Sequence, residues 1–439
     1  MTDVEQSTGL APRLGLRGVV LFGLAYMTPL IVLGTFGIVA ESTGGAVPTA
    51  YLLALVAMLF TAVSYGRMAA RFPVAGSAYT YVRRAIDSRV GFLVGWAVLL
   101  DYFFLPMVIW LIGAAYLNAQ FPSVPSWLWL VGFILLTTVL NVLGIQVAAR
   151  ANFLLMVFQV LVIAFFFALS LRQVVADGGS LVSSTPFFPA GATFGTISAG
   201  AALAAYAFLG FDAVTTLTEE TKDPRKTIPR AILLTALIGG AIFVLLAYAT
   251  QLAHPGSAFD DSSSAAFEIA KTIGGNLFGS VFLAGLVVAQ FASGIAAQAG
   301  ASRLMYAMGR DGVLPRKVFA YLHPRLRTPA FGIALVGVVG LVALTLDVST
   351  STSFINFGAF TAFTFVNLSV IALYLRERGP VLTGLVFPAI GAVVDVWLLT
   401  NLDGIALTLG LVWLGLGVVY LAVLTRGFRA APPEMAFEE

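Results

Sequence analysis

Two aspartates within long apolar segments are the residues of this sequence best able to do chemistry. Asp101 lies in the run VLLDYFFLPM, and Asp212 lies in the run FLGFDAVTT. A carboxylate placed in a membrane costs at least about 2.5–3.5 kcal/mol, so such groups normally face a cavity or a partner. Buried acids of this kind bind an ammonium group or a proton. We therefore predict that Asp101 and Asp212 serve a cationic substrate, a proton or both.

Tyrosines accompany these acids. Tyr102 directly follows Asp101, Tyr206 precedes Asp212, and Tyr26 lies in the first apolar segment. An aromatic face beside an ammonium group adds a cation–π attraction of about 0.5–2 kcal/mol. Each tyrosine alone is typical of core packing, but the three beside two acids favour a cation site. Up to residue 375, lysine and arginine occur in the apolar segments only at or near their ends, which predicts a cavity of negative potential.

Other chemistries lack the residues that they need. The sequence has no cysteine, and its only histidines, His254 and His323, fall in polar connecting stretches. This disfavours metal, thiolate and Ser–His chemistry, so we expect no cofactor, no metal and no enzyme. The net charge of +3 is too small to indicate a nucleic-acid partner. A membrane-embedded enzyme that uses the two aspartates, or a channel, is the alternative from another class.

Composition identifies the elements that must position these residues. The 439 residues are 59% apolar and 10% charged, against about 25% charged in soluble domains. A mean hydropathy of +0.96 fits a polytopic protein in contact with lipid. Since a span needs roughly 20 apolar residues, we expect twelve transmembrane helices. They are expected near 16–40, 47–70, 90–118, 127–146, 151–172, 193–218, 229–251, 276–307, 329–346, 352–375, 382–400 and 405–425.

The basic residues fix the orientation of these spans. If both termini are cytoplasmic, every lysine and arginine except Arg172 and Lys271 falls in an inward segment. This asymmetry obeys the positive-inside rule. The segment from Arg71 to Arg89 is too charged to span and is typical of a short amphipathic helix on the inner surface. We therefore predict a multi-pass protein of the cytoplasmic membrane with both ends inside.

Two of the expected spans are interrupted. Pro29, Gly34 and Gly37 lie inside the first, and Gly210 lies two residues before Asp212 in the sixth. Interrupted spans at matching places in two halves are typical of transporters, whose substrate sites lie at the breaks. We predict one membrane domain, 1–439, with a first repeat at 14–173 (helices 1–5), an inverted second repeat at 193–375 (helices 6–10), and helices 11–12 at 382–425. Asp395 lies outside the repeats and is a weaker functional candidate.

The same segments carry a family resemblance. Matching stretches include GLAYMTP, SYGRMAARFPVAGSAYTY, VGWAVLLDYFFLPM, FLGFDAVTTLTEETKDPRKTIPRAI, SRLMYAMGRDGVLP and INFGAFTAFTFVNLSV. They resemble the amino acid–polyamine–organocation (APC) permeases, and among these the bacterial putrescine importers. The resemblance implies an all-α, five-plus-five inverted-repeat fold in which helices 1 and 6 unwind around the substrate, with two C-terminal helices outside the repeats. It also implies alternating access.

The resemblance assigns roles to individual residues. The implied substrate-binding residues are Tyr26, Thr28, Gly34, Thr35, Asp101, Tyr102, Tyr206, Phe208, Gly210 and Asp212. The implied proton-coupling residues are Asp212, Glu219 and Glu220. One departure concerns Gly34, which stands where putrescine importers carry an aspartate. Losing that acid weakens the case for a diamine relative to a monoamine.

These observations predict a proton-coupled importer of a small, putrescine-like amine. An amino acid permease or exchanger of the same fold is the alternative. The fifth expected span contains no lysine, which some family members use as a proton-linked switch, so coupling is expected to use acids. Coupling to sodium is the alternative. The expected partners are the amine or amino acid substrate, a proton and the lipid bilayer.

Overall fold

The computed structural model describes residues 14–73, 77–144, 149–218, 220–310, 312–326 and 328–433. Within these ranges the regular structure is helical, apart from one isolated bridge between Leu14 and Thr221. The elements are α1 (Leu16–Met27), α2 (Ile31–Thr43), α3 (Val47–Arg71), α4 (Ser77–Ala85), α5 (Ser88–Gln120), α6 (Ser126–Val142), α7 (Ala149–Ala176), α8 (Phe194–Ala204), η1 (Ala205–Phe208), η2 (Ala213–Leu217), α9 (Pro224–Ala253), η3 (Ser262–Ser264), α10 (Ala265–Arg310), α11 (Arg316–Phe319), α12 (Ala330–Gly340), η4 (Leu341–Leu344), α13 (Val348–Glu377), η5 (Leu382–Val386), α14 (Phe387–Thr400) and α15 (Gly404–Leu424).

Most of these helices are long and apolar enough to cross a membrane. In the described residues, nine candidates meet that test, and the bent pair α1–α2 makes a tenth if it is one span. The shorter apolar helices Ser126–Val142 and Ala330–Leu344 fall on the expected fourth and ninth spans. With 17 residues, α6 is about 26 Å long, slightly less than a bilayer core. The all-helical membrane fold is therefore confirmed, while the count of twelve spans stays a prediction.

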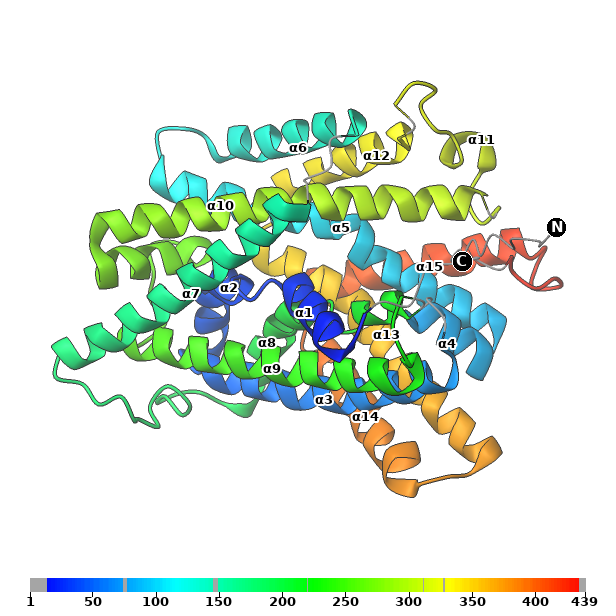
Figure 1. Ribbon diagram of the computed structural model, residues 1–439, viewed down its shortest axis with the longest axis horizontal. Coiled ribbons are helices and arrows are strands. Elements are labelled where there is room, and N and C mark those ends of the chain that lie inside the picture. The colour runs from blue at the N-terminus through cyan, green and yellow to red at the C-terminus, as the bar shows by residue number, and fades with distance from the viewer. Residues whose placement is uncertain are drawn as a thin grey trace, which may run out of the picture.

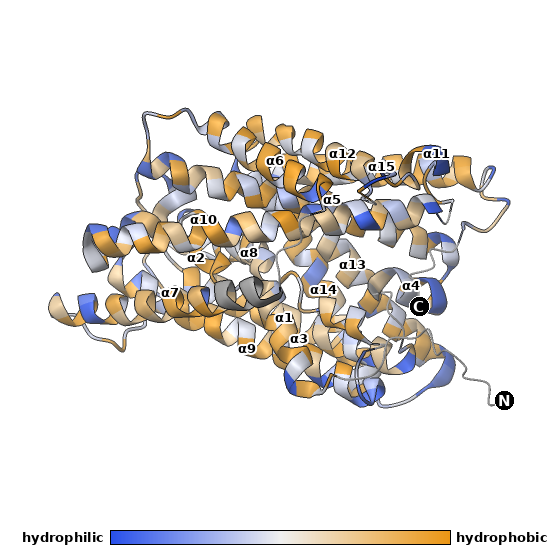
Figure 2. Ribbon diagram, turned by 45° about the horizontal axis from the view of Figure 1, so that its top comes forward, coloured by the Kyte–Doolittle hydropathy of each residue, from blue (hydrophilic) through white to orange (hydrophobic). Residues whose placement is uncertain are grey.

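The helices lie mostly along one direction, which is horizontal in Figure 1. Hydrophobic residues cover their lengths, and hydrophilic residues gather toward their ends (Figure 2). Large apolar side chains such as Leu411, Val419 and Val423 are exposed along α15. Because water would not favour such a continuous apolar face, these surfaces suit contact with lipid.

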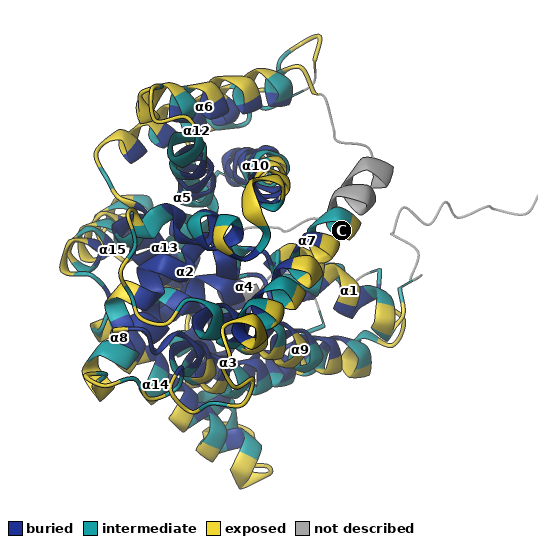
Figure 3. Ribbon diagram, turned by 90° about the vertical axis from the view of Figure 1, so that its left-hand side faces the viewer, coloured by how far each residue is buried: buried dark blue, intermediate teal, exposed yellow. Residues whose placement is uncertain are grey.

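Tight packing joins the central helices. Viewed end-on, α2 and the neighbouring parts of α5 and α13 are the most buried, and exposure rises toward α6, α7 and α14 (Figure 3). Reciprocal hydrogen bonds attach α15 to α5: Trp96 Nε1 donates to the Trp413 carbonyl at 2.9 Å, and Trp413 Nε1 donates to the Trp96 carbonyl at 2.8 Å. The C-terminal helix is thereby anchored to a central one.

The first predicted interruption is present, but proline causes it. Helices α1 and α2 meet at 49° across Thr28, Pro29 and Leu30. Proline disfavours a helical conformation in the residue before it, and Thr28 has φ +46° and ψ +77°. The Thr28 hydroxyl donates to the Ala25 carbonyl at 3.3 Å, which also accepts the Thr28 N–H, and it lies 3.4 Å from the Tyr26 carbonyl. Gly34 and Gly37, expected at the break, lie inside α2.

The second interruption divides the sixth expected span. Helix α8 tightens into the 3-10 turn η1, and the chain then turns at Leu209–Asp212 before η2. Gly210 has φ +106°, a conformation that side chains with a Cβ rarely adopt. The turn therefore depends on glycine at this position.

The amphipathic segment expected between Arg71 and Arg89 contains the helix α4. Its Tyr81, Val82 and Ala85 are buried, and the helix packs against α5 and α13. This prediction of a helix is confirmed. The helix therefore lies beside α5 as a partly covered element at one end of the bundle (Figure 1).

Candidate substrate site

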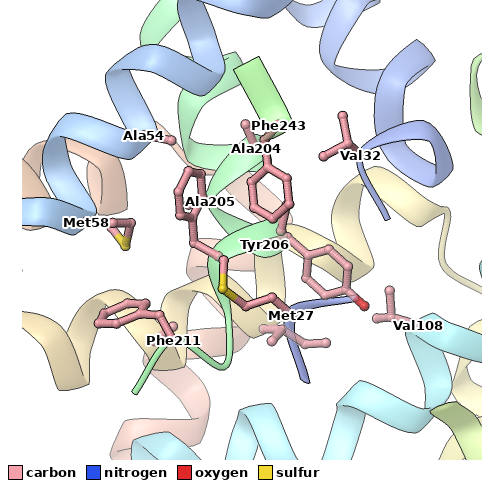
Figure 4. Close-up of a cluster of buried hydrophobic side chains, with 14 of the residues drawn as sticks. Met27, Val32, Ala54, Met58, Val108, Ala204, Ala205, Tyr206, Phe211 and Phe243 are labelled. Carbon is pink, nitrogen blue, oxygen red and sulfur yellow. The ribbon is translucent and has the colours of Figure 1, made fainter. Parts of the chain in front are cut away.

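A cavity of about 470 Å³ lies between the two helix breaks. Around the breaks, Tyr206 and Met27 pack side by side in a buried cluster, and the Tyr206 hydroxyl points toward Val108 (Figure 4). The cavity wall draws on α1, α2, α4, α5, η1, η2, α10 and the turns between them. The residues that line it include Tyr26, Thr28, Tyr79, Asp101, Tyr102, Tyr206, Gly210, Asp212, Thr216, Gln290, Ser293, Arg303 and Arg310.

Most of the residues predicted from sequence meet in this wall. Both predicted aspartates line it, as do the three tyrosines, Thr28 and Gly210; the full set is Tyr26, Thr28, Asp101, Tyr102, Tyr206, Gly210 and Asp212. They come from three separate parts of the chain, which the breaks and α5 bring together. The arrangement supplies two carboxyl groups and three aromatic rings to one cavity, a combination suited to an ammonium group.

Asp101 projects from the middle of α5. Its Oδ1 atom is buried and has no hydrogen-bond partner among the described residues. One turn later, Pro106 lies inside the helix, and because proline has no N–H, the Tyr102 carbonyl lacks its intrahelical donor. Asp101 and Tyr102 both line the cavity, so the unpartnered Oδ1 of Asp101 is available there as an acceptor.

Asp212 is held where the unwound turn leads into η2. Its backbone carbonyl accepts hydrogen bonds from the Thr215 N–H at 2.9 Å and from the Thr215 hydroxyl at 2.7 Å. This fixes the backbone that carries the carboxyl group. Asp212 also interacts electrostatically with Asp101, so the charge on one acid affects the other.

Other predicted residues lie away from the cavity wall. Thr35 is buried, and its hydroxyl donates to the Ile31 carbonyl at 3.1 Å and lies 3.3 Å from the Tyr51 hydroxyl. Phe208 is buried against Phe243, with ring centroids 5.1 Å apart. A side chain at Gly34 would first meet Ile31 and Ile112. The roles of Gly34, Thr35 and Phe208 in binding stay predictions.

The two predicted coupling glutamates are placed differently. Glu220 is partly exposed beyond η2, and its backbone carbonyl accepts a hydrogen bond from the Leu14 N–H at 2.9 Å. It does not line the cavity. Glu219 lies outside the described residues.

The structure adds polar residues from α10 that sequence reasoning missed. Gln290 and Ser293 line the cavity, and Arg303 and Arg310 line it further along the same helix. The expectation of a cavity without basic residues is therefore wrong where the C-terminal turns of α10 form the wall. The two arginines are seven residues apart, a spacing that places both on one helix face, and this was the signal available in the sequence.

A further acid belongs to a separate, buried cluster. Asp395 on α14 is fully buried, and its Oδ2 accepts hydrogen bonds from the Thr61 hydroxyl and from Asn367 Nδ2, both at 2.9 Å. The Ser64 hydroxyl lies 2.5 Å from Asn367 Oδ1. The cluster joins α3, α13 and α14 and does not line the cavity.

Apolar helices interrupted around a cavity that carries buried acids are the architecture of a membrane transporter. The chain belongs to the amino acid permease family, whose model matches residues 18–381. It is thus a multi-pass membrane transporter of the APC group and not an enzyme, as the sequence predicted.

Individual relatives are similar over much of their length. The low-affinity putrescine importer PlaP of Escherichia coli (strain K12) is 44% identical over 434 residues, which cover 97% of this chain and 96% of PlaP. The branched-chain amino acid permease BcaP of Bacillus subtilis (strain 168) is 25% identical over 457 residues, with 97% and 95% covered. Cationic amino acid transporter 4 of Mus musculus is 30% identical over 393 residues, which cover 84% of this chain and 59% of the mouse protein.

Proposed function

We propose that this protein is a secondary active transporter that imports a small, putrescine-like amine across the cytoplasmic membrane. The observation that carries the proposal is the meeting of Asp101 and Asp212 in one cavity with Tyr26, Tyr102 and Tyr206. The 44% identity to a putrescine importer over nearly the whole chain supports the same substrate class. A volume of about 470 Å³ is within the usual range of small-molecule sites.

The proposed binding mode follows from charge. One ammonium group of the substrate lies between the carboxyl groups of Asp101 and Asp212, and the tyrosine rings cover it. The carbon chain of the substrate extends along the apolar wall formed by residues such as Val98 and Leu105. Because the described residues of the cavity wall offer no further acid to a second ammonium group, monoamines are expected to compete with diamines.

Alternating access gives the proposed transport cycle. The cavity reaches α4 and the last turns of α10, which the basic residues assign to the cytoplasmic side. On the opposite side, the Tyr116 hydroxyl donates to the Leu33 carbonyl at 2.7 Å, and Phe36 packs edge-on against Phe259. These contacts support an inward-facing state that is closed toward the exterior.

The proposal includes the finer architecture expected from the sequence. It has twelve spans, both termini in the cytoplasm, inverted repeats at 14–173 and 193–375, and helices 11–12 at 382–425. The two breaks, one in each proposed repeat, support this division. Coupling uses a proton bound at Asp212, with Glu219 and Glu220 at the inner end of the same segment; sodium is the alternative coupling ion.

An amino acid is the second candidate substrate, and Arg303 and Arg310 favour it. These side chains line the cavity that also contains the acids, so the wall offers groups for both an amine and a carboxylate. The similarity to BcaP, a branched-chain amino acid permease, points the same way. Competition experiments separate the two candidates.

Counterflow in proteoliposomes tests the proposal. Vesicles loaded with unlabelled putrescine are expected to accumulate labelled putrescine, and cadaverine and butylamine should compete better than leucine. Asp101→Asn is expected to reduce this counterflow at least about tenfold, while Asp177→Asn, a change in an exposed segment, should leave it intact. Strong competition by leucine with no competition by amines would contradict the amine assignment.

A further inference from the structure

A second, much smaller cavity lies behind the substrate cavity. Its volume is about 20 Å³, and Asp101 and Asp212 border both spaces. The remaining wall consists of Tyr65 from α3, Val98, Leu209, and three residues of α13: Ala359, Ala362 and Phe363. Val98 and Leu209 also border both spaces, so the two acids lie where the large space and the small one adjoin.

The small cavity has the size and the partners that a single water molecule needs. A buried water requires at least about 10–15 Å³ and two to four polar partners. The wall offers the carboxyl groups of Asp101 and Asp212 and the hydroxyl of Tyr65. Asp101 Oδ1 is buried without a hydrogen-bond partner among the described residues, and a polar atom in that state normally has a water beside it.

Other occupants fit this space less well. The end of an alkylamine brings a methylene chain that about 20 Å³ does not accommodate. A sodium ion would need the five side-chain oxygens of Asp101, Asp212 and Tyr65 to converge on one point, because the other wall side chains are apolar. The chemistry of the wall therefore selects water.

We propose that this cavity holds one water molecule that hydrogen-bonds Asp101 and Asp212 and transfers a proton between them. The inference rests on the proposed function, because it specifies how the two acids share the coupling proton. In the transfer, the protonated carboxyl group gives its proton to the water while the water gives one of its own to the other carboxylate. The water is unchanged, and one proton moves from one acid to the other.

The transfer links substrate binding to proton binding. An ammonium group in the large cavity favours the charged form of the carboxyl group nearest to it. The proton of that group then moves through the water to the other acid, so the pair retains it until the cavity opens. Ionisable side chains line the two cavities from several elements, namely Tyr65 of α3, Tyr79 of α4, Tyr26 of α1, Tyr102 of α5, Tyr206 of η1, and Arg303 and Arg310 of α10. Tyr81 of α4 also interacts with Asp212. The α13 side of the small cavity contributes no ionisable group.

Two variants of nearly equal shape at Ala362 test the proposal without altering either acid. Ala362 is 2% exposed and borders the small cavity. Ala362→Val fills the cavity with carbon, whereas Ala362→Thr places a hydroxyl there that can accept and donate a hydrogen bond. Each variant is assayed in proteoliposomes for labelled-putrescine counterflow and for accumulation driven by an imposed pH gradient.

The expected result separates the two variants. Ala362→Val should retain counterflow within about twofold and lose at least about tenfold in pH-driven accumulation, while Ala362→Thr should retain about half of that accumulation or more. Undiminished pH-driven accumulation in Ala362→Val would overturn the proposal. Equal losses in both variants would also overturn it, because packing rather than the oxygen atom would then matter.

A spectroscopic readout keeps the test independent of transport. A carboxyl group hydrogen-bonded to water absorbs at a lower C=O stretching frequency than one without that partner, so infrared difference spectra between acidic and alkaline pH should show a higher frequency in Ala362→Val. Ala362→Thr should resemble the unmodified protein. If no amine undergoes counterflow in the unmodified protein, the proposed function is wrong. An unchanged carboxyl band in Ala362→Val would separately contradict the bound water.

Discussion

The ring of Tyr26 lies directly against Gly210, so each helix break contacts the other. A Cβ atom built on Gly210 would overlap the Cδ1 and Cε1 atoms of the Tyr26 ring. Both residues line the substrate cavity, and Gly210 has the positive φ that glycine adopts at little cost. The first and sixth expected spans are thus in contact at the point where the substrate is expected to bind.

Gly210→Ala should therefore strongly reduce transport while the protein still folds. The methyl group displaces the Tyr26 ring into the cavity, and the left-handed backbone adds about 1–3 kcal/mol of strain. We expect at least about tenfold lower counterflow with measurable folded protein by size-exclusion chromatography. Gly300→Ala is the matched control, because a Cβ at Gly300 on α10 has no neighbour within 4 Å. Equal activity of both variants would show that the contact has no role.

Asp212→Asn should separate exchange from accumulation. The amide keeps the size of the side chain and imitates its neutral form, but it cannot exchange a proton. In the proposed cycle the ammonium group favours the charged form of one carboxyl group while the other retains the proton, and this linkage supplies the coupling free energy. Counterflow of putrescine should persist at a reduced rate, because one of the two carboxyl groups beside the ammonium group is lost, whereas accumulation driven by a pH gradient should fall to background. Intact pH-driven accumulation would remove Asp212 from the coupling mechanism.

The sequence predicted the composition of the site better than its geometry. Asp101, Asp212 and Tyr26 could be named because acids and breaks stand out against an apolar chain. Thr35 lies close to a break in sequence, yet its side chain points to Tyr51, because packing sets how α2 is rotated about its axis. The expected span 276–307 already contains Arg303, but hydropathy alone shows neither that α10 continues to Arg310 nor that both arginines line the cavity.

The buried Asp395 cluster should contribute to stability. Removing the carboxyl group in Asp395→Ala leaves the Thr61 hydroxyl and one N–H of Asn367 without this acceptor, and a buried unpaired polar group costs about 1–3 kcal/mol. Asp395→Asn keeps an oxygen that can accept both bonds and should be milder. Thermal inactivation in detergent, followed by size-exclusion chromatography, should rank unmodified protein above Asn and Asn above Ala. A cluster without structural importance would give three equal curves.

The proposed orientation is testable because the chain has no native cysteine. Ser180 lies in the exposed stretch between α7 and α8, and Lys317 is exposed on α11. Three expected spans separate them, so they should lie on opposite sides of the membrane. A membrane-impermeant thiol reagent should label Ser180→Cys in intact cells and Lys317→Cys only after permeabilisation. The reverse pattern would invert the proposed topology, and labelling of both from one side would contradict the number of spans.

Arg303 should lower the apparent affinity of the inward-facing cavity for amines. It is exposed and lines the cavity along with Arg310, on the part of α10 beyond Gln290 and Ser293. A positive charge at a cavity mouth lowers the local concentration of cations, and salt screens this effect over about 10 Å at 0.1 M. Arg303→Gln should therefore reduce the half-saturating putrescine concentration in inside-out vesicles by about two- to fivefold at low salt, and the difference should shrink as salt rises. Arg303→Lys keeps the charge and should behave like the unmodified protein. If the shift in Arg303→Gln does not depend on salt, or if Arg303→Lys shows the same shift, the arginine acts through its contacts rather than through its charge.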